Sequence, residues 1–390
     1  MQLILKLFTG ILLLTSCKKS SSVSDTPTAS IDNTSKDRAV VNSNIVFKVT
    51  LSKAATTAVS IGYNTVAGSA VENTDYLPST GTLSIPAGQT TGDISIAITG
   101  DSTRKGNNDF KVHLSNPQNC SIAKADATGT IVNENGTYFP VDNIGYSTPA
   151  IYPGYTLVWS DEFNGSIVDR SNWGYETGNG GWGNNELENY TSSNKNSFVS
   201  NGNLIIEARK EKSGTANYTS ARMVTKGRKD FKYGRIDIRA KLPKGQGIWP
   251  ALWMLGTNID AVSWPACGEI DMLELLGDNP SKMYSTLHWG GDGNQNKSKG
   301  TNYTLSGGSF DQQFHVYSMD WKQDSISIFI DDKKIYAASS ADFVGATSNP
   351  FNNNFFFIFN IAVGGDWPGN PDGTTVFPQR MVVDYVRVFQ

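Results

Sequence analysis

Between residues 28 and 135, short segments of alternating hydrophobic and polar residues are separated by turns rich in Gly, Asn and Asp. These segments read NIVFKVTLS, AVSIGYNT, GTLSIPAG, GDISIAITG, DFKVHLS and ATGTIVNEN. A period of two residues places the hydrophobic side chains on one face of a strand. No long segment repeats hydrophobic residues at the spacing of a helix. The pattern therefore predicts an all-β protein whose first domain is a β-sandwich.

The length of the chain, 390 residues, exceeds the usual size of one domain, so we expect two folded units. Residues 17–27 are polar and Ser-rich, which predicts an unstructured tether. Residues 136–154 contain Pro, Gly and Tyr without clean periodicity, which predicts a linker. The second domain then covers residues 155–390 and has the same texture of short strands and turns.

The chain starts with MQLILKLFTGILLLTSC, a hydrophobic stretch with one Lys. It is shorter than the ~20 residues of a membrane-spanning helix, so residues 1–16 predict a secretion signal. The end of the stretch, Leu14-Thr15-Ser16-Cys17, resembles the lipobox of bacterial lipoproteins, in which the Cys is diacylated. This resemblance implies an exported chain held in a bacterial membrane, by expectation the outer one, through Cys17. The alternative is an ordinary signal peptide with an incidental Cys.

Charge and ligand-type residues exclude several classes of function. The formal net charge is -3 and the basic residues form no long run, so nucleic-acid binding is not expected. Cys120 and Cys267 fall in different predicted domains, which predicts free thiols. The chain has three His (His113, His288 and His315), and none has a Cys or His partner at the spacing of zinc ligands. We expect oxygen ligands for any metal.

One strand-like segment, CGEIDMLE at residues 267–274, carries acids where hydrophobic residues are expected. In a regular strand Glu269 and Asp271 point one way and Glu274 the other. One extra residue, inserted as a β-bulge at Met272-Leu273, would bring all three acids to one face. Carboxyl groups gathered on one face repel and are costly to desolvate, which moves their pKa values apart. Acid/base catalysis requires such a separation of pKa values.

A retaining glycosidase needs a carboxylate nucleophile and a protonated carboxyl group about 5 to 5.5 Å apart. Glu269 and Glu274 meet this need if their long side chains lean together over Asp271. The alternative is a solvated edge strand with surface acids. The hydrophobic neighbours of the acids and the upstream segment GIWPALWMLG favour a site.

Tryptophan side chains near the acids are candidate platforms for sugar rings. Trp249 and Trp253 share a parity on the upstream strand, and Trp264 precedes the acidic segment. Large aromatic residues of β-sandwiches commonly lie in the core. We therefore expect at least one of the three only to pack.

The first domain resembles the Calx-beta domain in the segments FKVTLSKA, TDYLPSTGTLSIPAGQ, DFKVHLSNP and GTIVNEN, over roughly residues 28–135. The resemblance implies an immunoglobulin-like sandwich with acids after the strand that ends near Asp101 that help to bind calcium. Here that stretch reads DSTRKGNND, with Lys105 and Asn108 where the family commonly has carboxylates. A passive spacer is therefore expected rather than a calcium-stiffened adhesion or binding module.

The second domain resembles family 16 of the glycoside hydrolases, and within it the laminarinases (endo-1,3-β-glucanases). The matching motifs in residues 156–390 are LVWSDEFNG, GWGNNELENYT, YTSARM, YGRIDIRAKLPKGQGIWPALWMLG, WPACGEIDMLE, STLHWG, IFNIAVGGDWPG and VVDYVRVF. The resemblance implies a concanavalin-like jelly roll that hydrolyses β-linkages with retention and needs no organic cofactor. It makes Glu269 the nucleophile, Glu274 the acid/base and Asp271 the orienting acid between them. The bulged form EIDMLE resembles the laminarinases rather than the mixed-linkage lichenases.

The same resemblance implies contacts to substrate outside the acidic strand. Asn185 and Arg222 match positions that hold sugar hydroxyls, and Glu186 is a further candidate from the same motif as Asn185. Each could instead be a turn or surface residue. His288 matches a His that lines the site near the acid/base, and its alternative is a satisfied imidazole in the core. Residues 290–308 are expected to form a polar loop that shapes the cleft, which leaves the preference for endo or exo cleavage open.

A structural ion is also implied. In MVVDYVRVF, Asp384 shares strand parity with Val382 and Val386, and a carboxylate among aliphatic neighbours needs a partner. The resemblance implies calcium held by Asp384, by Glu162 of the opening DEF and by the carbonyl of Gly202 in NGNL. Ligation by oxygen alone suits calcium. The alternatives are a salt bridge to Arg or Lys, or a face of the strand open to solvent.

We expect an exported, lipid-anchored and monomeric enzyme that cleaves internal β-1,3 bonds of laminarin-type glucans, with β-glucan and the lipid bilayer as its partners. Within the same family, the alternatives are a hydrolase of mixed-linkage β-glucan or of an algal galactan. From another class, the alternative is a carbohydrate-binding surface protein without turnover. A binding protein needs the tryptophans but not two Glu residues that flank an Asp.

Overall fold

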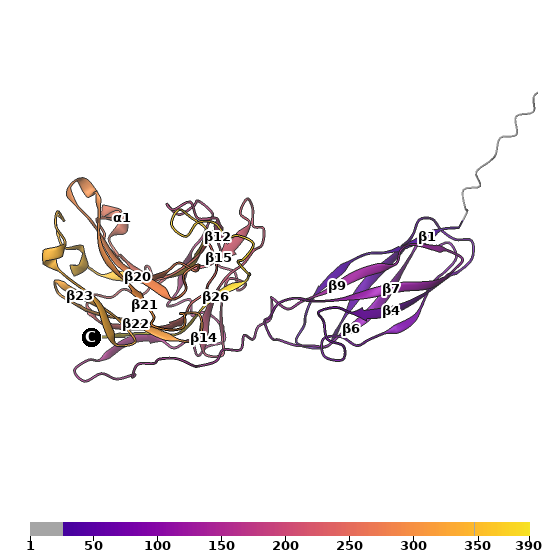
Figure 1. The fold of residues 1–390 in the computed structure, drawn as a ribbon, viewed down its shortest axis with the longest axis horizontal. Helices are drawn as coiled ribbons and strands as arrows, with labels where there is room; N and C mark the ends of the chain where they lie inside the picture. Colours follow the sequence, from indigo (N-terminus) through magenta and orange to yellow (C-terminus); the bar gives the residue numbers. More distant parts are fainter. Residues whose placement is uncertain (1–25, 347) are drawn as a thin grey trace, which may run out of the picture. The chain divides into compact units, whose positions relative to one another are not determined.

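The computed structural model describes residues 26–346 and 348–390, and the chain divides into two units between Gly136 and Thr137 (Figure 1). The predicted signal peptide and Cys17 lie outside the described residues. Strands dominate both units, which confirms the all-β prediction. The helical elements of the described residues are α1 (Ile259–Val262) and the 3-10 helices η1 (Asp292–Asn294), η2 (Ser340–Asp342) and η3 (Pro350–Asn352). No helix in these ranges is long and apolar enough to cross a membrane.

The first unit is a sandwich of two sheets. One sheet holds β6 (Thr91–Ile98), β3 (Ser43–Leu51), β1 (Thr28–Ile31) and β8 (Ser121–Lys124), in that spatial order. The other holds β2 (Thr34–Asp37), β9 (Asp126–Val132), β7 (Asn108–Gln118), β4 (Val59–Ala67) and β5 (Thr80–Ile85).

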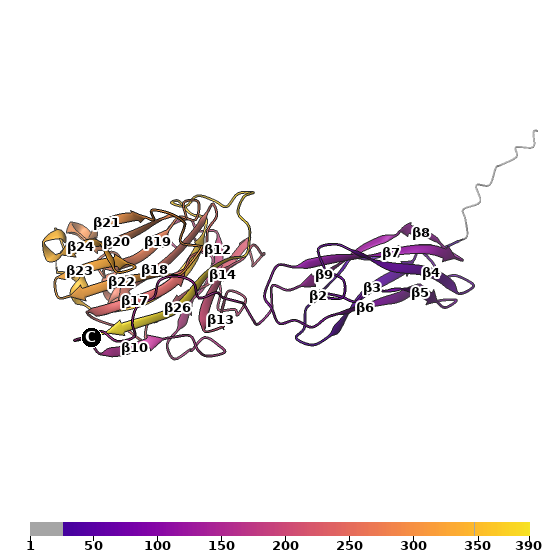
Figure 2. The ribbon, with the colours of Figure 1, turned by 60° about the horizontal axis from the view of Figure 1, so that its bottom comes forward.

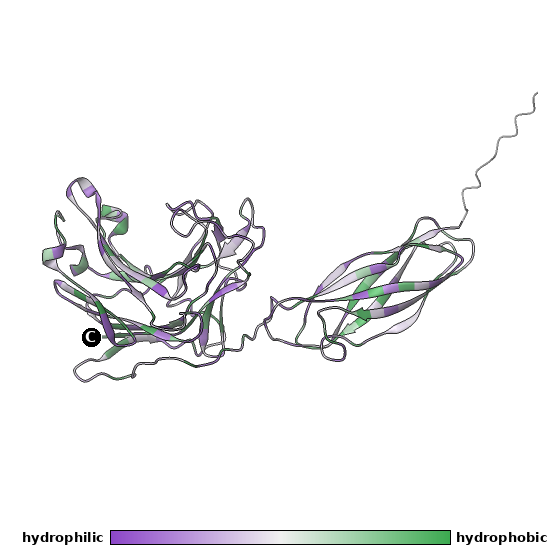
Figure 3. Ribbon diagram, in the orientation of Figure 1, coloured by the Kyte–Doolittle hydropathy of each residue, from purple (hydrophilic) through white to green (hydrophobic). Residues whose placement is uncertain are grey.

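Alternation along the strands builds the core of this unit, as Figure 3 shows by hydropathy. Along β3, for example, Ile45, Phe47 and Val49 are buried while the residues between them are exposed. All six segments predicted from the sequence are strands. The short strands β1, β2 and β8 were not predicted, because four residues are too few for a clear alternation.

Two cations of the chain neutralise acids of the first unit near the segment DSTRKGNND. The Arg38 and Asp75 side chains are only 3% and 5% exposed, and Nη1 of Arg38 lies 2.7 Å from Oδ1 of Asp75. Nε of Arg38 also donates to the carbonyl of Thr99. Nζ of Lys105 lies 3.1 Å from Oδ2 of Asp101. Although burial alone would raise it, hydrogen bonds from Thr103 and Lys105 lower the pKa of Asp101 to about 2.

We predict that Arg38→Met destabilises the first unit by about 3 to 5 kcal/mol, because it leaves the buried Asp75 carboxylate only the partly exposed Lys105, whose Nζ lies 3.7 Å from Oδ1 of Asp75. Lys105→Met is the matched control: Lys105 is 39% exposed, and a partly exposed pair contributes about 1 kcal/mol or less. Amide hydrogen exchange of β3, β6 and β7 in the full chain measures the difference. Equal loss of protection in both variants would contradict the role given to Arg38.

The second unit contains two large sheets that lie one over the other (Figures 1 and 2). The first holds β13 (Ser197–Ser200), β14 (Asn203–Ala208), β26 (Gln379–Phe389), β17 (Gly234–Lys241), β22 (His315–Lys322), β23 (Ser325–Ile330) and β24 (Lys333–Ser339), and β10 (Leu157–Asp161) also pairs with β26. The second holds β11 (Gly174–Glu176), β16 (Arg222–Val224), β25 (Phe355–Val363), β18 (Ile248–Gly256), β19 (Glu269–Leu275), β20 (Lys282–Gly290) and β21 (Asn296–Thr304). A small sheet pairs β12 (Glu188–Tyr190) with β15 (Tyr218–Ser220).

The main core of the second unit lies between its two large sheets. It is built from residues such as Ile236 and Ile238 of β17, Leu252 of β18, and Phe357 and Phe359 of β25, all fully buried. This two-layer arrangement is the predicted jelly roll. It leaves the outer face of the seven-stranded sheet free to carry a groove.

Two segments differ from their predictions. Residues 137–154 belong to the second unit instead of forming a free linker. Arg239, buried in β17, donates to the carbonyls of Asn143 and Tyr146, and the backbone N–H of Thr148 donates to the hydroxyl of Tyr385. Side chains of the sheet hold this segment, so it needs no periodic pattern of its own.

The predicted polar loop at residues 290–308 contains β21, an edge strand that pairs with β20 along nine residues. It lacks hydrophobic alternation because most of its side chains are exposed. The lysines Lys297 and Lys299 are typical of a protected sheet edge.

Candidate active site

The central strand of the site, β19, contains the predicted bulge. Its pairing with β20 shifts register between Asp271 and Glu274, so that three steps along β19 match two along β20. The pairing with β18 shifts at the same place. Met272 and Leu273 are both fully buried in the core, while Glu269, Asp271 and Glu274 all line a groove on the other face. The bulge prediction is therefore confirmed, and the acids share one face.

The groove has a volume of about 660 Å³ and lies on the outer face of the seven-stranded sheet. Trp249, Trp253 and Trp264 all line it. The expectation that at least one of them only packs in the core is therefore wrong. Trp253 also packs against a small buried cluster, and its indole N–H donates to Oδ1 of Asn360 at 2.8 Å. One ring can therefore serve both core and groove.

Each of the outer acids accepts a hydrogen bond from a tryptophan. Nε1 of Trp264 donates to Oε2 of Glu269 at 3.0 Å, and Nε1 of Trp249 donates to Oε1 of Glu274 at 3.1 Å. These bonds fix one oxygen of each carboxyl group. The other oxygen of each carboxyl group has no hydrogen bond to a tryptophan.

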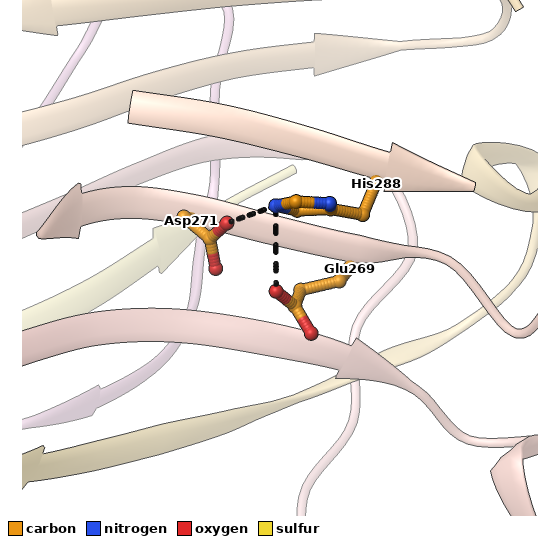
Figure 4. Close-up of side chains that lie close together, drawn as sticks. All are labelled: Glu269, Asp271 and His288. Atoms are coloured by element: carbon orange, nitrogen blue, oxygen red, sulfur yellow. Dashed lines mark ion pairs between the residues drawn. The ribbon is translucent and has the colours of Figure 1, made fainter. Parts of the chain in front are cut away.

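His288 of β20 lines the groove, which excludes the alternative of an imidazole in the core. Figure 4 shows its ring beside the carboxyl groups of Asp271 and Glu269. Its Nε2 lies 3.5 Å from Oδ2 of Asp271 and 3.9 Å from Oε1 of Glu269. Its Nδ1 lies 3.1 Å from Oδ1 of Asn296. The imidazole thus bridges the nucleophile candidate and the acid beside it.

The three acids differ in how strongly their charged forms are favoured. Burial raises the pKa of Glu269, but His288, Trp264, Asp271 and Arg222 all oppose that rise. Burial and the charge of Glu269 raise the pKa of Glu274 to about 8, and the hydrogen bond from Trp249 opposes this only in part.

For Asp271, burial and the charges of Glu269 and Glu274 raise the pKa well above its usual value. Glu269 therefore has the most neighbours that favour its charged form, and Glu274, with a pKa of about 8, holds its proton at neutral pH. A carboxylate beside a protonated carboxyl group is the pair that retaining glycosidases use.

Arg222 lies in the wall of the groove, as predicted. Its guanidinium lies 4.7 Å from the ring centre of Trp253 and 5.0 Å from that of Trp182. Nε of Arg222 donates to Oε2 of Glu176 at 2.6 Å. Two rings and one carboxylate thus hold a cation where it can donate hydrogen bonds to sugar hydroxyls.

The motif GWGNNE contributes differently from the prediction. Glu186 lines the groove and accepts hydrogen bonds from the side chains of Asn184 and Tyr190. Asn185 does not line it: its backbone is left-handed (φ 56°), and its amide donates to Asp366. Asn184 lines the groove in its place, because the tight turn directs successive side chains to different sides.

Several residues of the groove were not predicted from the sequence. The aromatic and polar ones are Trp182, Asn184, Thr286, Asn296, Asn360 and Trp367. Trp182 and Trp367 lie in the motifs GWGNNE and GGDWPG, where an aromatic residue beside a glycine-rich turn is a signal of a sugar platform. The ring of Trp367 meets that of Trp249 edge to face at 5.3 Å. Asn360 interrupts the hydrophobic run FFFIFNIAV, which is itself a signal.

The residues predicted to hold calcium each have another partner or place. Both carboxylate oxygens of Glu162 accept hydrogen bonds from Arg387 at 2.8 Å. Oδ2 of Asp384 lies 2.8 Å from Nη1 of Arg239. Gly202 lies in the turn between β13 and β14 with a left-handed backbone (φ 71°).

The prediction that Asp384 shares strand parity with Val386 is wrong. The pairing of β17 with β26 shifts register at Arg239, which leaves Asp384 as an extra residue in β26. Val386 and Val388 lie in the core, whereas Asp384 is partly exposed and forms the salt bridge that was the alternative. The two carboxylates are already neutralised by arginines and do not form a ready calcium cage. Calcium at Glu162, Gly202 and Asp384 stays a prediction, and the chemistry of the groove does not depend on it.

Comparisons with known proteins follow the same division into two units. Residues 28–135 match the Calx-beta domain, and residues 184–387 match the glycosyl hydrolases family 16. The chain is 40% identical over 271 residues to glucan endo-1,3-beta-glucosidase A1 of Niallia circulans, a match that covers 64% of this chain and 40% of that protein. It is 41% identical over 255 residues to the beta-glucanase of Rhodothermus marinus, covering 61% of this chain and 86% of that protein.

Solved structures of laminarinases also match the second unit of the chain. The laminarinase catalytic domain from Thermotoga maritima matches with a TM-score of 0.56 and 47% identity, over 60% of this chain and 98% of that one. The match to the family takes in more than half of the 390 residues and all three acids of β19. The chain therefore belongs to family 16 of the glycosyl hydrolases and carries a Calx-beta domain ahead of its hydrolase domain.

Proposed function

We propose that this chain is a retaining endo-β-glucanase that hydrolyses internal β-1,3 bonds of laminarin-type glucans. The observation that carries the proposal is the bulge of β19, which gathers Glu269, Asp271 and Glu274 on the floor of one groove. The names of the relatives support the substrate: a glucan endo-1,3-beta-glucosidase from Niallia circulans and laminarinases among the solved structures.

The reaction proceeds in two steps. In the first, the Glu269 carboxylate attacks the anomeric carbon, Glu274 gives its proton to the leaving oxygen, and the bond between that carbon and that oxygen breaks. In the second, Glu274 takes a proton from water, the water oxygen attacks the same carbon, and the Glu269 carboxylate is released. Two inversions at one carbon leave its configuration unchanged.

Asp271 and Trp264 prepare the nucleophile. The hydrogen bond between the side chains of Asp271 and Glu269, together with the indole N–H of Trp264, favours the charged form of Glu269. Both groups are already in place before substrate binds, so no reorganisation is needed in the reaction. They also leave Oε1 of Glu269, rather than Oε2, as the attacking oxygen.

Aromatic rings supply the surface for the polysaccharide. Trp182, Trp249, Trp253, Trp264 and Trp367 all line the groove. Apolar faces combined with a few polar donors are typical of ligand sites, and sugar rings offer both C–H faces and hydroxyls. Trp264 and Trp367 are half-exposed, so the groove is open to a long chain.

Other relatives support three alternatives. The chain is 28% identical to an endo-1,3-1,4-beta-glycanase of Rhizobium meliloti and 32% identical to a keratan-sulfate endo-1,4-beta-galactosidase of Sphingobacterium multivorum. It is also 37% identical to a beta-1,3-glucan-binding protein of Penaeus monodon. The intact set of acids favours turnover over binding alone.

The proposal predicts that Glu269→Ser abolishes hydrolysis of laminarin, by a factor on the order of a thousand or more, while binding remains. Removal of the nucleophile prevents the glycosyl-enzyme from forming but leaves the tryptophans in place. Size analysis of the products from laminarin, mixed-linkage glucan and agar measures both turnover and linkage. Undiminished turnover by the variant would refute the role of Glu269, and exclusive cleavage of agar would refute the substrate.

The proton on Glu274 gives the enzyme a pH limit. Because Glu274 must be protonated to act as the acid and its pKa is about 8, kcat/KM should fall tenfold per pH unit above about pH 8. Trp249→Phe removes a hydrogen bond that lowers this pKa, so the falling limb should move to higher pH in that variant. A wild-type profile that stays flat to pH 10 would contradict this assignment of the acid.

We also propose that the protein is exported and anchored to a bacterial membrane by lipid on Cys17, with the Calx-beta domain as a spacer. The support is the lipobox-like sequence of residues 14–17 and the polar stretch after it. Cys17→Ala should move the protein from the membrane fraction to the supernatant of expressing cells. Retention in the membrane fraction would rule out this anchor.

A further inference from the structure

Three ligand-type side chains converge at one end of the acidic strand (Figure 4). Glu269, Asp271 and His288 each offer one ligand atom, and these atoms all lie within 4.8 Å of one another. The two distances from Nε2 of His288 are 3.5 Å to Asp271 and 3.9 Å to Glu269. No other such group of three His, Cys, Asp or Glu residues occurs in residues 26–346 and 348–390.

A second observation points to a ligand at this place. Asp271 is 3% exposed, and its Oδ2 has no hydrogen-bond partner among the described residues. This is the same oxygen that faces Nε2 of His288. A buried oxygen without a partner is costly, and a cation placed between Asp271 and His288 would satisfy Oδ2 by displacing any proton that the Asp271 carboxyl group holds.

The spacing suits a small transition metal. Bonds of about 2.0 to 2.1 Å from zinc to nitrogen and oxygen put tetrahedral ligand atoms roughly 3.3 Å apart, and small rotations of the side chains close the remaining gap. One imidazole with two carboxylates favours zinc or copper over calcium or magnesium, which prefer oxygen alone. Three protein ligands leave a fourth position open to water.

We propose that Glu269, Asp271 and His288 form a binding site for a divalent transition metal such as Zn²⁺, and that the metal inhibits the enzyme reversibly. A metal on Oε1 of Glu269 occupies the oxygen that Trp264 leaves available for attack. Metal and polysaccharide therefore compete for the same carboxylate. This site goes beyond hydrolysis, since the chain would bind the metal whether or not it cleaves glucan.

Calorimetric titration of the full chain with ZnCl₂, in a buffer without chelators, tests the site directly. We expect one Zn²⁺ per chain at this site and at least an approximately tenfold loss of affinity in His288→Gln. Glu269→Ser removes a different ligand of the same site and should also weaken Zn²⁺ binding. Agreement between the two variants would show that the loss of affinity is not caused by a folding defect of one of them. Near-UV circular dichroism checks that each variant is folded.

The matched control is His113→Gln. His113 is exposed in the first unit, and its Nδ1 lies 2.9 Å from Oδ1 of Asp126, so this pair resembles the site but lacks a third ligand. Affinity for Zn²⁺ should be unchanged in this variant. Absence of binding to the wild type, or equal affinity in His288→Gln, would overturn the proposal.

Steady-state kinetics test the proposed inhibition separately from metal binding. In the wild type, Zn²⁺ should raise the KM for laminarin without changing kcat, and an excess of EDTA should restore the original KM. Binding by calorimetry without any effect on KM would overturn the inhibition. Because calorimetry does not depend on turnover, a chain that fails to cleave laminarin would refute the proposed function and still leave the metal site testable.

Discussion

The hydrogen-bond ladder of a β-sheet allows side chains only two directions, and the site depends on breaking that rule once. With a regular ladder, a strand that carries Glu269 and Asp271 on its outer face must bury Glu274 in the core. The extra residue at Met272 and Leu273 buries two hydrophobic side chains in succession and returns Glu274 to the outer face. The same irregularity thus completes the core and brings together the acids of the groove.

Gathering three carboxyl groups raises the free energy of their charged forms. The neighbours of each acid then determine which carboxyl group is charged most easily. Glu269 has four neighbours that favour its charge, whereas Glu274 has one indole and the repulsion of Glu269. The tryptophans therefore have two tasks. Their faces line the groove for sugar rings, and the N–H groups of Trp249 and Trp264 tune the acids beneath them.

Most of the fold could be predicted from the sequence, because alternation is a local property. All six strands expected in the first unit are present, as is the two-layer form of the second. What the sequence did not predict depends on partners far along the chain or on the backbone conformation of a single turn. Residues 137–154 lack periodicity and are nevertheless fixed by Arg239 and Tyr385. Asn184 replaces Asn185 in the groove because of the backbone angle of one turn.

Two bulges show why one irregularity was predictable and the other was not. In β19 the regular pattern would bury a carboxyl group that chemistry requires outside, so the conflict itself indicated an extra residue. In β26 the regular pattern placed the Asp384 carboxylate among valines. A calcium ion would have been a sufficient partner for that carboxylate, so the regular pattern conflicted with nothing and did not indicate an extra residue. The register shift beside Arg239 instead turns Asp384 toward that arginine. A bulge can be predicted from sequence where it rescues a function, but one that only lets a salt bridge form must be observed.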